Sequence, residues 1–156
     1  METAVKQFQT FEELEAYKFA REFRKAMYRV ARRLPDFENY EMASQIRRAA
    51  LSLTNNVAEG HGRFHFLDQI KFMLQARGSL QELLDDLNAC LDEVYLSGPE
   101  VAKLKQEGYN ALKVLNGYLH WLRQRKLVQS GELHEDAPRY GDTDEDLEEW
   151  LSSLAL

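Results

Sequence analysis

Apolar residues recur along the chain at the three- and four-residue spacing that is typical of amphipathic α-helices. The first such stretch opens at Thr10–Glu13, whose Thr-x-x-Glu pattern is that of a capping box, and it stops before Pro35. Its apolar positions are Ala16, Phe19, Ala20, Phe23, Met27, Val30 and Leu34. This spacing predicts a first helix between Thr10 and Pro35.

Two further helices are predicted in the middle of the chain. The first covers about residues 38–60 and should end near residues 60–62, Gly-His-Gly, where two glycines permit left-handed backbone. Its core positions are Met42, Ile46, Ala49, Ala50, Leu53 and Val57. The second covers about residues 66–96, which contain no proline and one glycine. Its apolar stripe runs through three heptads and consists of Met73, Ala76, Leu80, Leu83, Leu84, Leu87, Cys90, Leu91 and Val94.

Residues 97–100, Ser-Gly-Pro-Glu, mark the boundary between the third helix and a fourth that runs to about Lys126. Glycine ends the first of these helices, while serine, proline and glutamate form the capped start of the next. The fourth helix is apolar over an unusually wide face, because Val114 and Trp121 flank the row that contains Tyr118. Monomers rarely expose such a face, so these three residues are predicted to form an oligomer interface. The alternative is that they lie on the surface of a monomer or under its C-terminal tail.

Four helices joined by short connections bury their apolar stripes most simply as an antiparallel up-and-down four-helix bundle. We therefore predict an all-α bundle over residues 1–127 and an acidic C-terminal tail over residues 128–156. Within this tail, residues 143–154 have the pattern of a short amphipathic helix that only docking would order. The N-terminus lacks the pattern of a signal peptide, and no apolar run is long enough for a membrane span. A cytoplasmic protein without membrane contact is expected.

The net charge of -6 is unevenly distributed. Residues 1–126 carry 19 basic and 17 acidic side chains, whereas residues 127–156 carry one arginine and nine acidic residues. The body of the protein is therefore not acidic, and its basic residues gather on one side of the first helix and around the second. These predicted nucleic-acid-binding residues are Lys18, Arg21, Lys25, Arg29, Arg32, Arg47, Arg48 and Arg63. Such a stripe suits phosphate backbones, although the outer face of any soluble helix is charged.

The residue pairs that could support catalysis or metal binding are incomplete. They are Glu12 with Glu15, Glu82 with Asp85, and His61 with His65. Paired carboxylates hold magnesium in helical nucleotide pyrophosphohydrolases, but 70 residues separate the two acidic pairs here. Two histidines alone do not make a zinc site, and the chain has no Glu-x-x-His pair for a di-iron centre. We expect no metal, no cofactor and no enzymatic activity, and a buried, unreactive Cys90.

Polar residues enter the apolar rows at one end of the predicted bundle. Arg77 lies seven residues before Leu84 in an apolar row of the third helix, and a charge there needs a partner. Glu59 of the second helix is the natural candidate, with Asn56 and Ser79 completing the hydrogen bonds. We predict that these four polar residues form a structural network that fixes the register of the two helices.

Two blocks of sequence carry a resemblance to a known family. Residues 45–63, QIRRAALSLTNNVAEGHGR, closely resemble the signature of the bacterial four-helix-bundle family named after the 23S rRNA intervening-sequence proteins. Residues 72–83, FMLQARGSLQEL, resemble the motif of the third helix of that family and follow at the expected distance. The resemblance covers about residues 8–126, with Thr54 where the family often has proline.

This resemblance implies a ring-like homopentamer without known enzymatic activity. A related branch, the accessory variability proteins of diversity-generating retroelements, forms similar pentamers that bind nucleic acid and a reverse transcriptase. The family itself has no settled molecular role, so the resemblance leaves open whether this member serves a retroelement, an rRNA insertion or neither. An oligomeric accessory factor is expected, with RNA or DNA and a reverse transcriptase as its candidate partners. A protein–protein scaffold without nucleic-acid binding and a magnesium-dependent nucleotide hydrolase stay open as alternatives.

Overall fold

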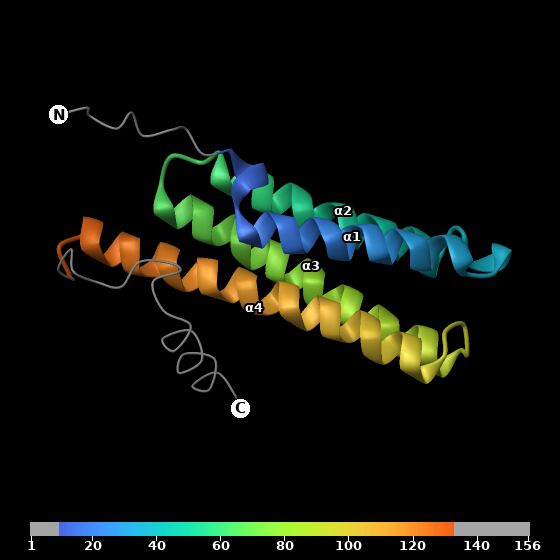
Figure 1. Ribbon diagram of the computed structural model, residues 1–156. Coiled ribbons are helices and arrows are strands. Elements are labelled where there is room, and N and C mark those ends of the chain that lie inside the picture. The colour runs from blue at the N-terminus through green and yellow to red at the C-terminus, as the bar shows by residue number, and fades with distance from the viewer. Residues whose placement is uncertain (1–9, 133–156) are drawn as a thin grey trace.

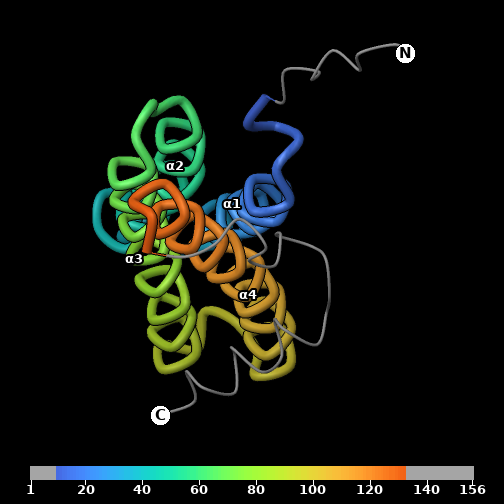
Figure 2. The backbone as a smooth tube through the Cα atoms, turned by 90° about the vertical axis from the view of Figure 1, so that its left-hand side faces the viewer, coloured from blue at the N-terminus to red at the C-terminus, as the bar shows by residue number. Residues whose placement is uncertain are grey.

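The computed structural model describes residues 10–132, in which four long α-helices form an up-and-down bundle (Figure 1). The helices are α1 (Glu15–Arg33), α2 (Met42–His61), α3 (Phe66–Asp92) and α4 (Gly98–Gln129), with short 3-10 turns η1 (Phe11–Glu13) and η2 (Asp36–Glu38). Each helix packs against the next one along the chain, and α4 also packs against α1 and closes the bundle (Figure 2). The predicted all-α four-helix bundle is confirmed.

The core is a single apolar cluster to which all four helices contribute. Its largest fully buried side chains are Phe23, Met27, Ile46, Leu53, Val57, Met73, Leu80, Leu83, Leu87, Leu115, Leu119 and Leu122. Burial of one such side chain contributes about 1.5–3 kcal/mol to the free energy of unfolding, before the loss of conformational entropy is counted. The amphipathic stripes therefore position the four helices.

The two hairpin connections at one end of the bundle are joined by side chains. Tyr95, in the connection between α3 and α4, donates a hydrogen bond of 2.8 Å to Glu38 of η2. Glu38 also accepts a bond from the backbone N–H of Met42 and so caps α2. Arg33 at the end of α1 pairs at 2.8 Å with Glu100, which belongs to the predicted capping box of α4. This capping box is confirmed, and the α1–α2 and α3–α4 hairpins are fixed to one another.

The start of α1 differs from the prediction. Thr10 precedes η1, its side chain caps no backbone N–H, and α1 begins only at Glu15. Between the two elements, Leu14 has extended backbone and its side chain is buried in the core. Insertion of Leu14 into the core therefore interrupts the helix that the Thr-x-x-Glu pattern predicts.

The chain reversals also use different residues from those expected. Gly60 lies inside α2 and Gly62 has helical backbone, so neither adopts the predicted left-handed conformation. A Cβ atom on Gly60 would lie 2.8 Å from Cβ of Phe72, so this glycine allows α2 and α3 to approach closely. In the connection between α3 and α4 the left-handed residue is Val94 (φ 59°), which is 83% exposed. Val94 is therefore not part of the core stripe.

The end of α4 lies close to the expected position. The helix continues to Gln129, so the predicted domain boundary at residue 127 falls within its last turn. The expected short helix over residues 143–154 lies outside the described residues. No helix within residues 10–132 is long and apolar enough to cross a membrane.

Candidate nucleic-acid interface

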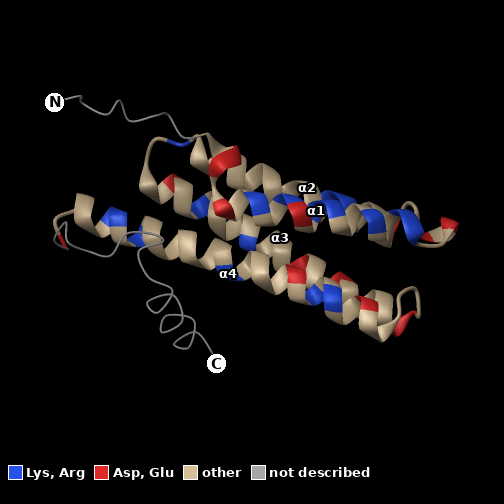
Figure 3. Cartoon of the chain, in the orientation of Figure 1, with Lys and Arg blue, Asp and Glu red and all other residues tan. Residues whose placement is uncertain are grey.

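The basic residues of α1 follow from its amphipathic pattern. One side of the helix is buried in the core, so charged residues at intervals of three and four share the outer side. Figure 3 shows Lys and Arg along the outer side of the α1–α2 hairpin. The predicted cations of α1, Lys18, Arg21, Lys25, Arg29 and Arg32, lie along this helix.

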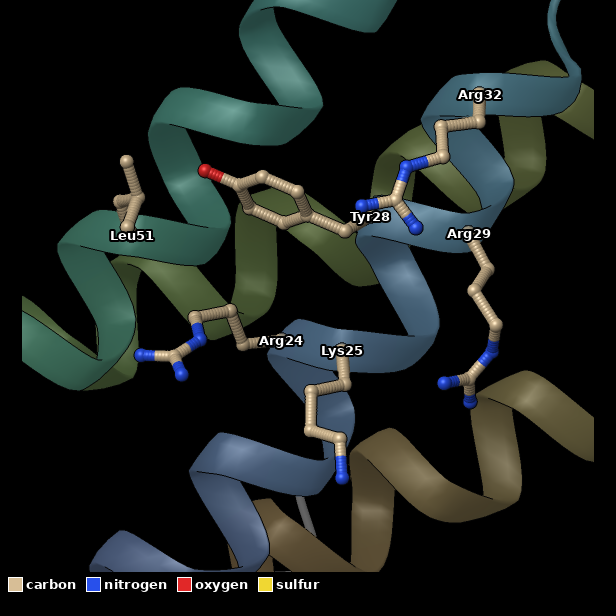
Figure 4. A pocket seen from close by; sticks show the side chains of 6 residues that line it. All are labelled: Arg24, Lys25, Tyr28, Arg29, Arg32 and Leu51. Atoms are coloured by element: carbon tan, nitrogen blue, oxygen red, sulfur yellow. The ribbon is translucent and has the colours of Figure 1, made fainter.

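A groove with a volume of about 570 Å³ lies beside α1 and α2 (Figure 4). We call it the basic groove. Its lining residues are Arg24, Lys25, Tyr28, Arg29, Arg32 and Leu51. Four cations, one aromatic and one aliphatic side chain therefore line the groove, with no acidic residue among them. Such a concave, positive surface focuses the field of its cations and raises the local concentration of anions.

Two of the four cations of the basic groove flank the ring of Tyr28, and the other two point away from it (Figure 4). In Figure 4 the ring points towards α2, with Arg24 on one side of it and Arg32 on the other. Nη1 of Arg24 donates a hydrogen bond of 2.9 Å to Oγ1 of Thr54 on α2, which orients that guanidinium. Lys25 and Arg29 extend towards α4 in the same view.

The cations of the basic groove are incompletely neutralised. Lys25 pairs at 3.1 Å with Glu22, an exposed contact of a kind that contributes only about 0.2–1 kcal/mol. No ion pair joins Arg24, Arg29 or Arg32 to a carboxylate within residues 10–132. Several guanidinium groups therefore have donors available for an external anion, and guanidinium groups suit phosphate oxygens because they can donate two parallel hydrogen bonds.

Two of the predicted α1 cations lie outside the basic groove, nearer the start of α1. Lys18 pairs with Glu15 at 3.2 Å. Arg21 and Lys18 line a separate hollow of about 120 Å³ together with Glu12 and Glu22. Glu22 also pairs with Lys25, and Glu22 and Glu107 share a neighbouring hollow with Arg29. Because no acidic residue lines the basic groove itself, it is the stronger candidate site.

The three predicted arginines of α2 and its following turn also lie elsewhere. Nη2 of Arg47 donates to the backbone carbonyl of Asn39 at 2.9 Å. Arg48 lines a small hollow between α2 and α3. Arg63 pairs with Glu59 at 2.7 Å and lies 4.7 Å from the ring centre of Phe72. The structure does not bring these arginines into the groove with Arg29 and Arg32.

Sequence reasoning missed three residues of the basic groove, namely Arg24, Tyr28 and Leu51. Arg24 and Tyr28 lie eight and four residues before Arg32 and form one row with it along α1. The helical spacing could therefore have indicated these two residues. Leu51 comes from a different helix, and its position depends on how α2 packs against α1. The spacing within one helix carries no information about that packing.

The predicted polar network forms in part. Oγ of Ser52 lies 2.8 Å from Oγ of Ser79, and Nδ2 of Asn56 donates to Ser52. Asn56 and Ser79 are thus joined through Ser52, and the bonds link α2 to α3. That these bonds fix the register of the two helices stays a prediction.

The expected pairing of Glu59 with Arg77 is wrong. Glu59 is exposed and pairs with Arg63, and Nε of Arg77 is buried without a hydrogen-bond partner. The reason is the register. Ser52 faces Ser79 and Gly60 faces Phe72, so Arg77 lies about one turn, roughly 6 Å, from the level of Glu59.

Most of the wide apolar face of α4 packs against the core of its own subunit. Residues 115–119 are buried consecutively, and Tyr118 is 5% exposed. Tyr118 is therefore a core residue and not the surface residue that the interface prediction requires. Val114 and Trp121 are half-buried, and the Trp121 ring stacks on Tyr118 with 5.7 Å between ring centres. Their role in an oligomer interface stays a prediction.

Two titratable groups of α3 lie in a partly buried environment. Burial, followed by the negative charges of Glu82 and Asp85, raises the pKa of Asp86 to about 6. Its Oδ2 atom is buried and has no hydrogen-bond partner in the described chain. Burial and nearby carboxylates also raise the pKa of the Cys90 thiol to about 11, so this buried cysteine is protonated at neutral pH.

The acidic and histidine pairs noted in the sequence do not converge. Within the described residues, no group of three or more His, Cys, Asp or Glu side chains could hold a metal ion. The fold and the basic groove place the chain in the class of all-helical bundle proteins with a cationic surface groove.

The family follows from a comparison of the sequence. Residues 12–117 match the model of the 23S rRNA-intervening sequence protein family. The chain belongs to this family. A search of curated proteins gives no match.

Proposed function

We propose that the protein is a non-enzymatic accessory factor that binds RNA or DNA through the basic groove. The observation that carries this proposal is the meeting of Arg24, Lys25, Arg29 and Arg32 around one concave surface without an acidic lining residue. Phosphate contacts from such cations supply most of the sequence-independent affinity of nucleic-acid-binding proteins. The rigid helices α1 and α2 would hold the groove in place.

Oligomerisation is part of the same proposal. One groove with a few phosphate contacts binds weakly at physiological salt, whereas several copies joined in one particle act through effective concentration. We infer a homo-oligomer, most simply the homopentamer implied by the family resemblance, with Val114 and Trp121 of α4 at its contacts. The reverse transcriptase partner remains a prediction from that resemblance.

Binding is tested by fluorescence anisotropy with labelled RNA and DNA at salt concentrations from about 50 to 200 mM. The variant Arg29→Glu with Arg32→Glu reverses two groove charges. Lys71→Glu with Lys103→Glu is its control, because it changes the net charge equally at exposed positions of α3 and α4 outside the groove. The groove variant should lose at least tenfold in affinity, and loss of two contacts should reduce the salt slope for single strands by about 1.4. The control should stay close to the wild type.

Three results would overturn the proposal. Absence of binding by the wild-type protein at about 50 mM salt would leave the protein–protein scaffold as the better account. Equal losses in both variants would show that overall charge, and not the basic groove, governs binding. Turnover of nucleoside triphosphates with magnesium would favour the nucleotide hydrolase instead.

A further inference from the structure

The basic groove contains two side chains that phosphate binding alone does not need. Tyr28 is half-buried and lies between Arg24 and Arg32, and Leu51 enters the groove from α2 with 43% of its side chain exposed. An exposed leucine beside four cations presents apolar surface to whatever occupies the groove. The groove therefore offers an aromatic and aliphatic surface bordered by positive charge.

This combination suits a flat apolar group that is attached to phosphates. A nucleobase has a π-face that stacks on aromatic side chains, and its backbone supplies phosphates on both sides. The volume of about 570 Å³ lies within the range of about 300–1,000 Å³ that is usual for sites holding small molecules. The groove is thus large enough for one nucleoside-sized group.

A duplex cannot use this surface in the same way. Its bases are paired and stacked inside the helix, so it presents phosphates and groove edges, and a base must leave the stack to meet an aromatic ring. Unpaired strands can turn a base outwards at little cost. A groove with an exposed aromatic and aliphatic surface is therefore expected to favour single strands over a duplex.

We propose that the basic groove binds single-stranded nucleic acid, with one unstacked base against Tyr28 and Leu51. Arg24 and Arg32 hold phosphates on the two sides of that base, and Lys25 and Arg29 extend the path of the backbone towards α4. This inference rests on the proposed function and adds the strand type and the base-contacting residues.

The test compares a labelled single strand with a duplex of the same sequence. The variants are Tyr28→Leu, which keeps apolar bulk but removes the ring, and Tyr28→Phe, which keeps the ring. Tyr109→Leu is the control, because Tyr109 is an exposed tyrosine of α4 outside the groove. Stacking on an aromatic side chain accounts for about fivefold or more in affinity.

We expect the wild type to bind the single strand more tightly than the duplex. Tyr28→Leu should lose about fivefold to tenfold for the single strand only, with an unchanged salt slope because no charge is removed. Tyr28→Phe and Tyr109→Leu should bind as the wild type does. A merely structural role of Tyr28 would instead reduce binding of both strand types together.

Photo-crosslinking gives the same answer without a variant. An oligonucleotide containing 4-thiouridine should crosslink to Tyr28 or Leu51 of the wild-type protein, as mapped by mass spectrometry. This inference would be overturned if both strand types bound with equal affinity and Tyr28→Leu changed neither, or if crosslinks formed only at other residues. The proposed function would still stand in either case. Absence of binding to either strand type would remove the proposed function itself.

Discussion

Gly60 of α2 lies against α3 with no room for a side chain, and its replacement tests the packing of the bundle. A Cβ atom at Gly60 would come 2.6 Å from Cε of Met73 and 2.8 Å from Cβ of Phe72. The Met73 methyl group is at the end of a flexible side chain and can move. Cβ of Phe72 is bonded to the backbone, so α2 and α3 would have to separate. We therefore expect Gly60→Ala to destabilise the protein.

The expected size follows from two opposing terms. Overpacking a tight contact typically costs about 1–3 kcal/mol, and replacement of a helical glycine by alanine returns up to about 1 kcal/mol. With the full alanine gain, the net loss for Gly60→Ala should be up to about 2 kcal/mol. Gly78→Ala provides a matched control, because Gly78 is exposed within α3 and its added Cβ atom would meet nothing within 4 Å. This variant should gain about 0.5–1 kcal/mol.

Urea denaturation followed by circular dichroism measures both free energies. The helical gain of alanine is common to both variants, so Gly60→Ala should be less stable than Gly78→Ala by the overpacking cost of about 1–3 kcal/mol. Each kcal/mol corresponds to about 2–4 °C in Tm for a domain of this size. If Gly60→Ala were as stable as Gly78→Ala, the close approach of α2 to α3 at Phe72 would be refuted.

Other changes give distinct outcomes. Because the pKa of Asp86 rises from 3.8 to about 6 on folding, stability should fall as the pH rises from 4 to 6. Asp86→Asn should remove this fall and add about 1–2 kcal/mol at pH 7, measured by urea denaturation at both pH values. Val94→Gly should raise the free energy of unfolding by about 1 kcal/mol, because glycine adopts the left-handed backbone without strain. A lower Tm of this variant would show that Val94 is not strained. Trp121→Glu should reduce the particle mass measured by light scattering, because a charge at a subunit contact disfavours the oligomer. An unchanged mass would show that Trp121 of α4 does not lie at that contact. If the acidic residues 133–156 compete with nucleic acid for the groove, their deletion should tighten binding measured by fluorescence anisotropy. An unchanged affinity would contradict that competition.

Local signals made the helices predictable. The Ser97 capping box and the helix stop at Pro35 depend only on neighbouring residues, and both are as expected. The start of α1 was not predictable, because the burial of Leu14 depends on the rest of the core. The sequence indicates a turn at Gly60, whereas the structure shows that a side chain there would clash with Phe72 of α3. Residues next to Gly60 in the sequence do not reveal that contact.

The candidate site was predictable only along one helix. Lys25, Arg29 and Arg32 were expected to share a side of α1, and they line the same groove. The contribution of Leu51 and the failure of Glu59 to meet Arg77 both depend on the register between helices. That register places Ser52 opposite Ser79, which the periodicity of neither helix reveals.

Lysine footprinting tests most directly whether nucleic acid occupies the basic groove. The protein is acetylated with and without saturating single-stranded RNA, and modification is measured residue by residue with mass spectrometry. Lys25 lies in the groove, whereas Lys71 and Lys103 are exposed outside it. If RNA occupies the basic groove, Lys25 should be strongly protected and modification of Lys71 and Lys103 should be unchanged. Protection of Lys71 or Lys103 with Lys25 still fully reactive would contradict it.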